Sequence, residues 1–310
     1  MASVWRWTIG RRGFKPMKVG LIGVGTMGSR MAANLIKAGF TIFARDLDLK
    51  REKKAAELGA EIAKSPGEVA ESADVILLSL PMPSDVESVV CGEDGILSAA
   101  RPGQVIVDLS TVDPSSTQRN AAKARQANVG YLDSPVLGRP QNCGNWTLPV
   151  GGDKADLEKC KDVLGTLAKK IIHVGPSGHG NIVKLLNNMM FGAINSVTAE
   201  IMAICTKLGM SPKVLFDAIS ESGAASVSNL FLELGPKMLN RDFSPLFTTD
   251  LLYKDLKLAI SMAEEHGIPL LVAHSNQLVN EMARVKGLGA EDTSGVVKIY
   301  EELLGVVVCN

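Results

Sequence analysis

The sequence predicts an α/β domain followed by an all-helical domain. From residue 17 to about residue 174, short apolar runs alternate with segments of helical composition, which is typical of parallel strands joined by crossover helices. After the glycine-rich segment 175–180 the strand signals stop, and the remaining segments have helical patterns. We therefore expect a doubly wound parallel sheet in residues 17–178 and an all-α domain in residues 179–310.

The first predicted elements, in residues 18–39, are a buried strand, a glycine-rich turn and an amphipathic helix. The glycines have the spacing G-x-G-x-x-G: Gly23 permits the tight turn, Gly25 lets the backbone approach phosphates, and Gly28 lets the helix pack closely on the strand. The positive end of that helix then faces an anion. The pattern predicts a Rossmann-type site for a dinucleotide; an ordinary strand-to-helix turn and a cradle for another phosphate ligand are the alternatives. The predicted cofactor residues here are Gly23, Gly25, Thr26, Met27 and Gly28.

The choice of cofactor depends on Asp46, which ends the next apolar run. Its carboxylate would accept hydrogen bonds from the adenosine ribose hydroxyls and repel a 2′-phosphate, so NAD is the favoured cofactor. Arg45, Lys50 and Arg51 are close in the sequence and leave NADP as the alternative.

Two loops are the places where a ligand is expected, because parallel sheets bind ligands beyond the carboxyl ends of their strands. The first spans residues 80–82, and the second begins with Ser110 and Thr111, whose hydroxyls could face a cofactor. Asp113 and Pro114 then predict the cap and the first turn of a helix, so plain loop chemistry is the alternative. The strands after the first are expected at residues 41–46, 74–80, 104–110, 128–134 and 171–174.

Composition argues for small-molecule chemistry. Lysine plus arginine and aspartate plus glutamate number 33 each, and this zero net charge gives no indication of a nucleic-acid surface. The five cysteines are scattered and contain no C-x-x-C pair, so neither a disulfide framework nor a zinc site is indicated, and a reducing, cytoplasmic environment fits. The four histidines have no ligand spacing, and we expect no metal.

The first sixteen residues read as a segment outside the fold. Residues 1–16 carry four basic residues, no acid and no long apolar stretch, so a secretory signal is not expected. We expect a disordered extension or an upstream start codon, with a mitochondrial-type presequence as the alternative, and a fold that begins near Met17.

The helical domain is expected to open with one long helix over residues 181–208, which could form a spine between the domains. Its segment 185–205 is very apolar, but Asn188, Asn195 and Glu200 within it would be costly to bury in lipid. We therefore expect a buried helix and no membrane contact. Because several helices have wide apolar faces, we expect a homodimer or homotetramer. Further helices should begin near Ser211, Ser226, Thr248, Pro269 and Thr293.

Lys184 and Asn188 are four residues apart in this long helix, so their side chains leave one face of it, next to the glycine-rich hinge. Reduction of a carbonyl by hydride leaves negative charge on oxygen, and a positioned lysine can stabilise that charge and deliver the proton. Asn188 could orient the same oxygen without adding charge. Such a pair is more often a surface feature, but the apolar neighbours argue against a fully solvated face.

Several motifs in order resemble the β-hydroxyacid dehydrogenases, the family of 3-hydroxyisobutyrate dehydrogenase, from Lys18 to about Leu304. The likeness is more specific than any one motif because it extends over nearly the whole chain. The motifs are GLIGVGTMGSRMAANL at the cofactor turn, DLST at 108–111, DSPVLGR at 133–139, GNWTLPVGG at 144–152, GHGNIVKLLNN at 178–188 and KDLKLA at 254–259.

The resemblance implies a Rossmann domain followed by an all-helical domain, with Lys184 as the catalytic acid/base and Asn188 beside the substrate. It also implies that Lys254 reaches the cofactor from the helical domain, whereas an exposed lysine at a helix start is the alternative. Finally, it implies that the nicotinamide side is lined by Leu80, Pro81, Met82 and Thr111.

One departure from the family concerns the substrate loop. Many members read D-A-P-V-S-G-G where this chain has DSPVLGR, so the family serine that contacts the substrate carboxylate is Leu137 here. Arg139 offers a replacement, because a guanidinium can hold a carboxylate, sulfonate or phosphate through paired hydrogen bonds. A similar arginine marks sulfolactaldehyde reductase-like members, and a rim arginine in a surface loop is the alternative. The candidate substrate-binding residues are Ser134, Gly138, Arg139 and Asn188.

We expect an NAD-dependent oxidoreductase that interconverts a small, anionic 3-hydroxy acid and its semialdehyde, with Lys184 exchanging the proton. One alternative is a reductase of another short anionic aldehyde, such as succinic semialdehyde, tartronate semialdehyde or sulfolactaldehyde. Another is a catalytically silent cofactor-binding member of the family. An imine reductase-like enzyme is disfavoured because its acid position is usually Asp or Tyr.

Overall fold

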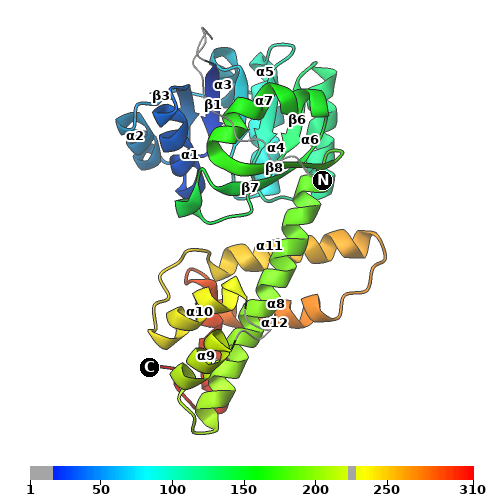
Figure 1. Ribbon diagram of the computed structural model, residues 1–310. Helices are drawn as coiled ribbons and strands as arrows, with labels where there is room; N and C mark the ends of the chain where they lie inside the picture. Colours follow the sequence, from blue (N-terminus) through cyan, green and yellow to red (C-terminus); the bar gives the residue numbers. More distant parts are fainter. Residues whose placement is uncertain (1–16, 223–227) are drawn as a thin grey trace, which may run out of the picture. The chain divides into compact units, whose positions relative to one another are not determined.

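The computed structural model describes residues 17–222 and 228–310, so the expected extension at 1–16 and the expected helix start at Ser226 lie outside the described residues. The described chain divides into two compact units (Figure 1). We call residues 17–110 with 118–177 the α/β unit, and residues 111–117 with 178–310 the helical unit.

The short segment 111–117 belongs to the helical unit, whereas the expected boundary at residue 178 assigns it to the sheet domain. Hydrogen bonds from Asn181 account for this difference. Its side-chain oxygen accepts from the N–H of Val112 (3.1 Å), and its Nδ2 donates to Thr117 Oγ1 (3.2 Å). The segment is therefore tied to the helical unit by buried polar contacts.

The α/β unit is built on one eight-stranded sheet with the strand order β3-β2-β1-β4-β5-β6-β7-β8. Strands β1 to β6 are parallel, β7 is antiparallel to β6, and β8 is parallel to β7. The order of the first six strands is that of the Rossmann fold, with its switch point between β1 and β4. The strands are β1 (Lys18–Ile22), β2 (Thr41–Arg45), β3 (Glu61–Ile62), β4 (Val75–Leu78), β5 (Val105–Asp108), β6 (Gly130–Asp133), β7 (Trp146–Gly151) and β8 (Ala168–Gly175).

The sheet is covered by helices on both faces, which is why β4 and β5 are buried throughout. On one face, Leu21 of β1 shares an apolar cluster with Met31 of α1 and Leu164 of α7. On the opposite face, α3 approaches β1 at Gly20, where a Cβ atom would overlap Val69. The helices with residues in the α/β unit are α1 (Thr26–Lys37), α2 (Leu49–Glu57), α3 (Pro66–Ser72), α4 (Pro83–Cys91), α5 (Ile96–Ala99), α6 (Pro114–Gln126), the 3-10 turn η1 (Pro140–Asn142) and α7 (Lys154–Leu167).

The local start and stop signals act as expected. Asp113 Oδ1 accepts from the N–H of Ser116 (2.7 Å), and Pro114 is the first residue of α6. Helix α1 ends at Lys37, and Gly39 follows it in the left-handed region with φ +94°.

The helical unit is organised around α8, which packs against α9, α10, α11, α12 and α13 (Figure 1). Within the described ranges, α8 alone is long and apolar enough to span a membrane. It is nevertheless a core helix, because its buried Asn195 donates to the carbonyl of Thr293 (2.8 Å). The elements are α8 (His179–Lys207), α9 (Pro212–Glu221), α10 (Asn229–Leu239), α11 (Thr249–Glu265), α12 (Val272–Val285), η2 (Thr293–Val296) and α13 (Val297–Leu304).

Two strands were not expected from the sequence. Strand β3 has only two residues and both are exposed, so it gives no apolar run. Strand β7 contains Pro149, which usually argues against a strand inside a sheet, yet Leu148 and Val150 are fully buried beside it. The antiparallel direction of β7 also corrects the expectation of a fully parallel sheet.

Candidate active site

The glycine-rich turn after β1 has the geometry that a phosphate cradle needs. Gly23 has φ +91°, which favours glycine, and a Cβ at Gly28 would overlap the carbonyl oxygen of Gly23. Helix α1 therefore starts directly against the turn. Its N-cap residue, Gly25, provides no side-chain cap, so the backbone N–H groups of the first turn, which includes Thr26 and Met27, can serve an anion.

A groove of about 570 Å³ opens at this turn. Its volume falls in the range of small-molecule and cofactor sites. The expected cofactor residue Met82 is not part of its wall, and Thr111 and Lys254 belong to the helical unit. The expected cofactor residues that line the groove are Gly23, Gly25, Asp46, Leu80 and Pro81.

The carboxylate of Asp46 is held in a fixed orientation at one end of the groove. Its Oδ2 accepts from the N–H of Val24 (2.8 Å), and its Oδ1 accepts from the N–H of Asp48 (2.9 Å). Arg51 Nη1 lies 3.8 Å from Asp46 Oδ1. Arg51 Nη1 would also lie 3.5 Å from a Cβ at Gly25, so the guanidinium is close to the glycine-rich turn. An acid for the ribose hydroxyls and a cation for a phosphate thus lie together in the groove wall.

The loop after β4 is fastened at both ends. The N–H of Leu80 donates to Ser110 Oγ (2.9 Å), and the N–H of Met82 donates to Asp85 Oδ2 (3.1 Å). Ser110 is buried, and its hydroxyl fixes this loop, which is the loop chemistry given above as the alternative to a cofactor contact. The loop is therefore a preformed wall of the groove.

Asp108 at the end of β5 is the buried acid behind that wall. Its Oδ1 accepts from the N–H of Ser110 (2.9 Å), and its Oδ2 accepts from the hydroxyl of Tyr131 (3.0 Å). Burial raises the pKa of Asp108 from 3.8 to about 6, and nearby Asp133 adds to the shift, while the bonds from Ser110 and Tyr131 oppose it. Burial and Asp108 also raise the pKa of Tyr131.

The expected substrate loop is anchored to β7. Leu137 and Thr147 exchange backbone hydrogen bonds (3.0 and 3.2 Å), and the carbonyl of Arg139 accepts from Trp146 Nε1 (2.8 Å). Gly138 lies so close to the ring of Trp146 that a Cβ would overlap it. Ser134 is fully buried, so the structure places it beneath the loop surface.

A chain of hydrogen bonds and one ion pair in the helical unit joins three of the expected site residues. Asn188 Nδ2 donates to Asp255 Oδ2 (2.5 Å), and Asp255 Oδ1 lies 2.9 Å from Lys254 Nζ. Lys254 Nζ also donates to the carbonyl of Thr111 (2.9 Å). Lys254 is therefore not the exposed helix-start lysine of the alternative interpretation. Lys184 is half-buried one turn before Asn188 on α8.

Asp255 is the site residue that sequence reasoning missed. It follows Lys254 directly and lies on the buried face of α11. The same face carries the buried apolar residues Leu252, Leu256 and Ala259. An acid at a position where the helix period requires an apolar residue was the available signal.

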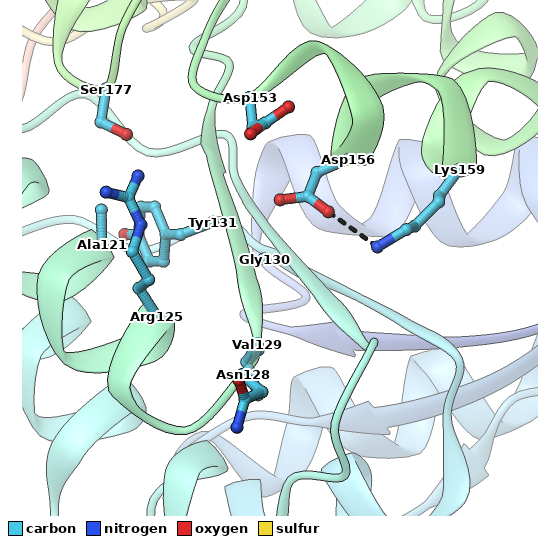
Figure 2. A pocket seen from close by; sticks show the side chains of 10 residues that line it. All are labelled: Ala121, Arg125, Asn128, Val129, Gly130, Tyr131, Asp153, Asp156, Lys159 and Ser177. Carbon is cyan, nitrogen blue, oxygen red and sulfur yellow. Dashed lines mark hydrogen bonds and ion pairs between the residues drawn. The ribbon is translucent and has the colours of Figure 1, made fainter.

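A second hollow of about 250 Å³ lies in the α/β unit, between α6, β6 and the start of α7. Figure 2 shows Arg125 and Ser177 on one side of it, and Asp156 paired with Lys159 (2.8 Å) on the other. Tyr131 lines it, but the Tyr131 hydroxyl is used by Asp108. This hollow shares no residue with the groove at the glycine-rich turn.

Comparison with known families agrees with this geometry. The family model for the NAD-binding domain of 6-phosphogluconate dehydrogenase matches residues 18–175. The model described as NAD-binding of NADP-dependent 3-hydroxyisobutyrate dehydrogenase matches residues 178–300. The strand order, the groove and these matches define a nicotinamide-dinucleotide-binding protein.

Individual relatives are similar over almost the whole chain. The 2-(hydroxymethyl)glutarate dehydrogenase of Eubacterium barkeri is 37% identical over 95% of this chain and 98% of its own. The probable mitochondrial 3-hydroxyisobutyrate dehydrogenase of Dictyostelium discoideum is 36% identical, with coverages of 90% and 89%. The structure of Mycobacterium tuberculosis 3-hydroxyisobutyrate dehydrogenase with L-serine has a TM-score of 0.83 and 29% identity, covering 92% of this chain and 99% of that one.

The chain belongs to the β-hydroxyacid dehydrogenase family, of the 3-hydroxyisobutyrate dehydrogenase type. It is a dehydrogenase that acts on a CH–OH group with NAD, and NADP is the alternative cofactor. The residues fit such a cofactor: the turn leaves room for a pyrophosphate, the first turn of α1 lacks a side-chain cap, and Asp46 is fixed beside the groove.

Proposed function

We propose that this enzyme interconverts a small 3-hydroxy acid, similar to 3-hydroxyisobutyrate, and its semialdehyde, with Lys184 as the acid/base. The observation that supports this most is the chain from Asn188 through Asp255 to Lys254 on the buried faces of α8 and α11. A buried charged pair joined to a carboxamide adds little to the stability of a helical core, because removing the charges from water costs about as much as their attraction returns. Such groups are kept where they orient a reacting molecule.

The proposed reaction needs one proton transfer between the substrate and the protein. NAD(P)⁺ supplies the hydride acceptor when it is bound. As the C–H bond of the alcohol breaks and the C=O bond forms, the neutral amine of Lys184 takes the hydroxyl proton. In the reverse direction, the ammonium stabilises the charge that develops on oxygen and returns the proton. Arginine could not take this role, because its guanidinium does not give up a proton in proteins.

Asn188 is proposed to orient the substrate. One of its two Nδ2 protons is used by Asp255, and its Oδ1 accepts from Asn187 Nδ2 (3.1 Å), so the amide cannot rotate. The second Nδ2 proton can then donate to a substrate oxygen in a fixed direction. Asp255 is a positioning residue in this scheme.

Arg139 is proposed to bind the acid group of the substrate. Because the carbonyl of Arg139 accepts from Trp146, Arg139→Ala would remove the guanidinium and keep this backbone anchor of the loop. We expect a rise of at least tenfold in KM with little change in kcat. Arg125→Ala, which removes an exposed guanidinium on α6, is the matched control. An unchanged KM in Arg139→Ala would exclude this role.

The names of the relatives support the substrate class. Both 2-(hydroxymethyl)glutarate and 3-hydroxyisobutyrate carry a primary alcohol on the carbon next to the one that bears the carboxylate. L-Threonate dehydrogenase of Cupriavidus necator, L-serine dehydrogenase of Pseudomonas aeruginosa and 3-sulfolactaldehyde reductase of Escherichia coli are each 30% identical to the chain, over at least 90% of it and 94% of their own length. The second candidate is therefore reduction of another short anionic aldehyde, which Arg139 favours. A cytoplasmic location and a homo-oligomer complete the proposal.

The substrate proposal is tested with a panel of alcohols and the purified enzyme, followed by NADH absorbance. The panel contains 3-hydroxyisobutyrate, 2-(hydroxymethyl)glutarate, 3-hydroxypropionate, serine, glycerate, 4-hydroxybutyrate and 2,3-dihydroxypropane-1-sulfonate, the alcohol that corresponds to sulfolactaldehyde. Lactate, the 2-hydroxy isomer of 3-hydroxypropionate, is the matched control. We expect the highest kcat/KM for a 3-hydroxy acid and none for lactate. Turnover of lactate or 4-hydroxybutyrate above every 3-hydroxy acid would contradict the proposal.

A further inference from the structure

A line of buried hydrogen bonds runs from β6 to the wall of the cofactor groove. The Tyr131 hydroxyl donates to Asp108 Oδ2 (3.0 Å), and the N–H of Ser110 donates to Asp108 Oδ1 (2.9 Å). The N–H of Leu80, in the groove wall, donates to Ser110 Oγ (2.9 Å). Tyr131, Asp108 and Ser110 are at most 4% exposed, so these bonds are shielded from water. We call these four residues the Tyr131 network.

The Ser110 hydroxyl has a single orientation in the Tyr131 network. It also hydrogen-bonds to the Asp108 carboxylate, a contact that lowers the pKa of Asp108. A hydroxyl has one proton and a carboxylate can only accept, so the proton of Ser110 points to Asp108. A lone pair of the same oxygen then faces the N–H of Leu80. Because Tyr131 holds the other carboxylate oxygen, the acid cannot rotate, and it determines how Ser110 holds Leu80.

Leu80 lies directly against the glycine-rich turn. A Cβ at Gly23 would overlap the carbonyl oxygen of Ser79 and would lie 3.2 Å from Leu80 Cδ2. Pro81, the next residue, also lines the groove but has no N–H, so the bond from Leu80 to Ser110 is the backbone anchor at this end of the wall. A shift of Leu80 would therefore change the shape of the groove beside the turn.

A buried acid at this place is costly for the fold. Burial raises the pKa of Asp108 to about 6, and the carboxylate of Asp133, on β6, adds to the shift. A neutral or apolar residue would avoid this cost. Natural proteins keep such costly groups mainly at functional sites.

We infer that Tyr131 and Asp108 are positioning residues for the cofactor: through Ser110 they hold Leu80, and with it the groove wall, in the place that receives the dinucleotide. Without the Tyr131 network the wall has to be ordered at the moment of binding. That ordering costs free energy and weakens the affinity for the cofactor.

A double-mutant cycle on NADH binding tests the inference. Ser110→Ala removes the hydroxyl that holds Leu80, and Tyr131→Phe removes only the hydroxyl that holds Asp108. We expect the NADH Kd, measured by fluorescence titration, to rise about tenfold in Ser110→Ala and about threefold in Tyr131→Phe. The double variant should bind NADH as Ser110→Ala does, because Tyr131 then has no hydroxyl through which to act on Leu80. Increases in Kd that multiply in the double variant, or an unchanged Kd in Ser110→Ala, would overturn the inference.

The matched control is Tyr300→Phe, at a half-buried tyrosine of α13 in the helical unit, which should leave the NADH Kd unchanged. Circular dichroism and urea unfolding show whether each variant is folded under the conditions of the titration. NADH binding is measured without a substrate, so the result does not depend on the role proposed for Lys184.

Amide hydrogen exchange gives a second readout that needs no bound cofactor. Segment 79–84 is favourable for this measurement, because its two prolines have no N–H and few amides besides that of Leu80 contribute to the signal. We expect exchange in this segment to be at least about threefold faster in Tyr131→Phe than in the wild type, and exchange in β7 to be unchanged. Equal exchange of segment 79–84 in the two proteins would overturn the inference, because Leu80 would then be held without Tyr131.

Discussion

Asp108 should make the stability of the α/β unit depend on pH, and Asp108→Asn should remove that dependence. Burial raises the pKa of Asp108 from 3.8 to about 6, a shift of about two units at about 1.4 kcal/mol each. The native state therefore binds the proton more tightly than the unfolded state. The corresponding stability is fully present below pH 3.8 and is lost as the pH rises through about 6. Ionisation of the Asp108 carboxyl lowers the free energy of unfolding by about 3 kcal/mol in total, and about 2 kcal/mol of this loss occurs between pH 4.5 and 7.5.

Asp108→Asn distinguishes the effect of the Asp108 charge on stability, which depends on pH, from the effect of its hydrogen bonds, which does not. Asparagine can accept from Ser110 or from Tyr131 but not from both, and this loss costs about 1–3 kcal/mol at every pH. Relative to the wild type, Asp108→Asn should therefore gain about 2 kcal/mol between pH 4.5 and 7.5. Tyr131→Phe should do the opposite, because its hydroxyl lowers the pKa of Asp108, so the pH-dependent loss becomes larger.

Urea unfolding followed by the fluorescence of Trp146 measures this gain. Trp146 is buried in the α/β unit, and replacement of Trp5 and Trp7 by Phe leaves it as the only tryptophan. A difference between Asp108→Asn and the wild type that is the same at pH 4.5 and 7.5 would refute the buried-acid reasoning.

Three further predictions concern the site. Gly28→Ala would force a Cβ onto the carbonyl of Gly23, so we expect a loss of about 3 kcal/mol or more in stability. We also expect weaker NADH binding, measured by fluorescence titration. An unchanged stability and an unchanged NADH Kd would show that α1 can shift to make room. The wild type should prefer NADH over NADPH by at least about tenfold in kcat/KM. Asp46→Asn should reduce this ratio about tenfold, because the variant lacks the carboxylate that repels the 2′-phosphate of NADPH. A wild-type preference for NADPH would refute this role of Asp46. Asp255→Ala leaves Asn188 without its acceptor, a cost of about 1–3 kcal/mol that should lower kcat/KM roughly tenfold to hundredfold. Asp255→Asn keeps an acceptor oxygen and should recover part of the lost kcat/KM. Equal kcat/KM values for the wild type and both variants would exclude a positioning role for Asp255.

Local patterns in the sequence predict the elements that depend on neighbouring residues. The continuous apolar runs of β1, β4 and β5, the glycine spacing after β1 and the cap at Asp113 are each determined within a few residues, and the structure has all of them. Strand β7 depends instead on long-range pairing: its Pro149 argues against a strand, and only the burial of Leu148 and Val150 in the sheet explains it.

The same distinction applies to the site. Lys184 and Asn188 share a helix, so their spacing alone predicts a common face. The partner that fixes Asn188 is Asp255, which is 67 residues away in the sequence. Likewise, the sequence left open whether the Ser110 hydroxyl faces a cofactor or serves the loop, and the bond that it accepts comes from Leu80, 30 residues away. Such contacts depend on how the elements pack, and no local pattern encodes them.

Lys184 is proposed to exchange the proton, and single-turnover kinetics of Lys184 variants tests this role most directly. We expect Lys184→Ala to reduce the rate of hydride transfer by about 10²–10⁴-fold while the NADH Kd stays within about twofold of the wild type. Lys184→Arg, which keeps the charge but cannot take the proton, should be similarly slow. Lys213→Ala, at a surface lysine paired with Asp217, is the control and should react at the wild-type rate. Hydride transfer in Lys184→Ala at the wild-type rate, with the substrate bound, would contradict the proposed mechanism.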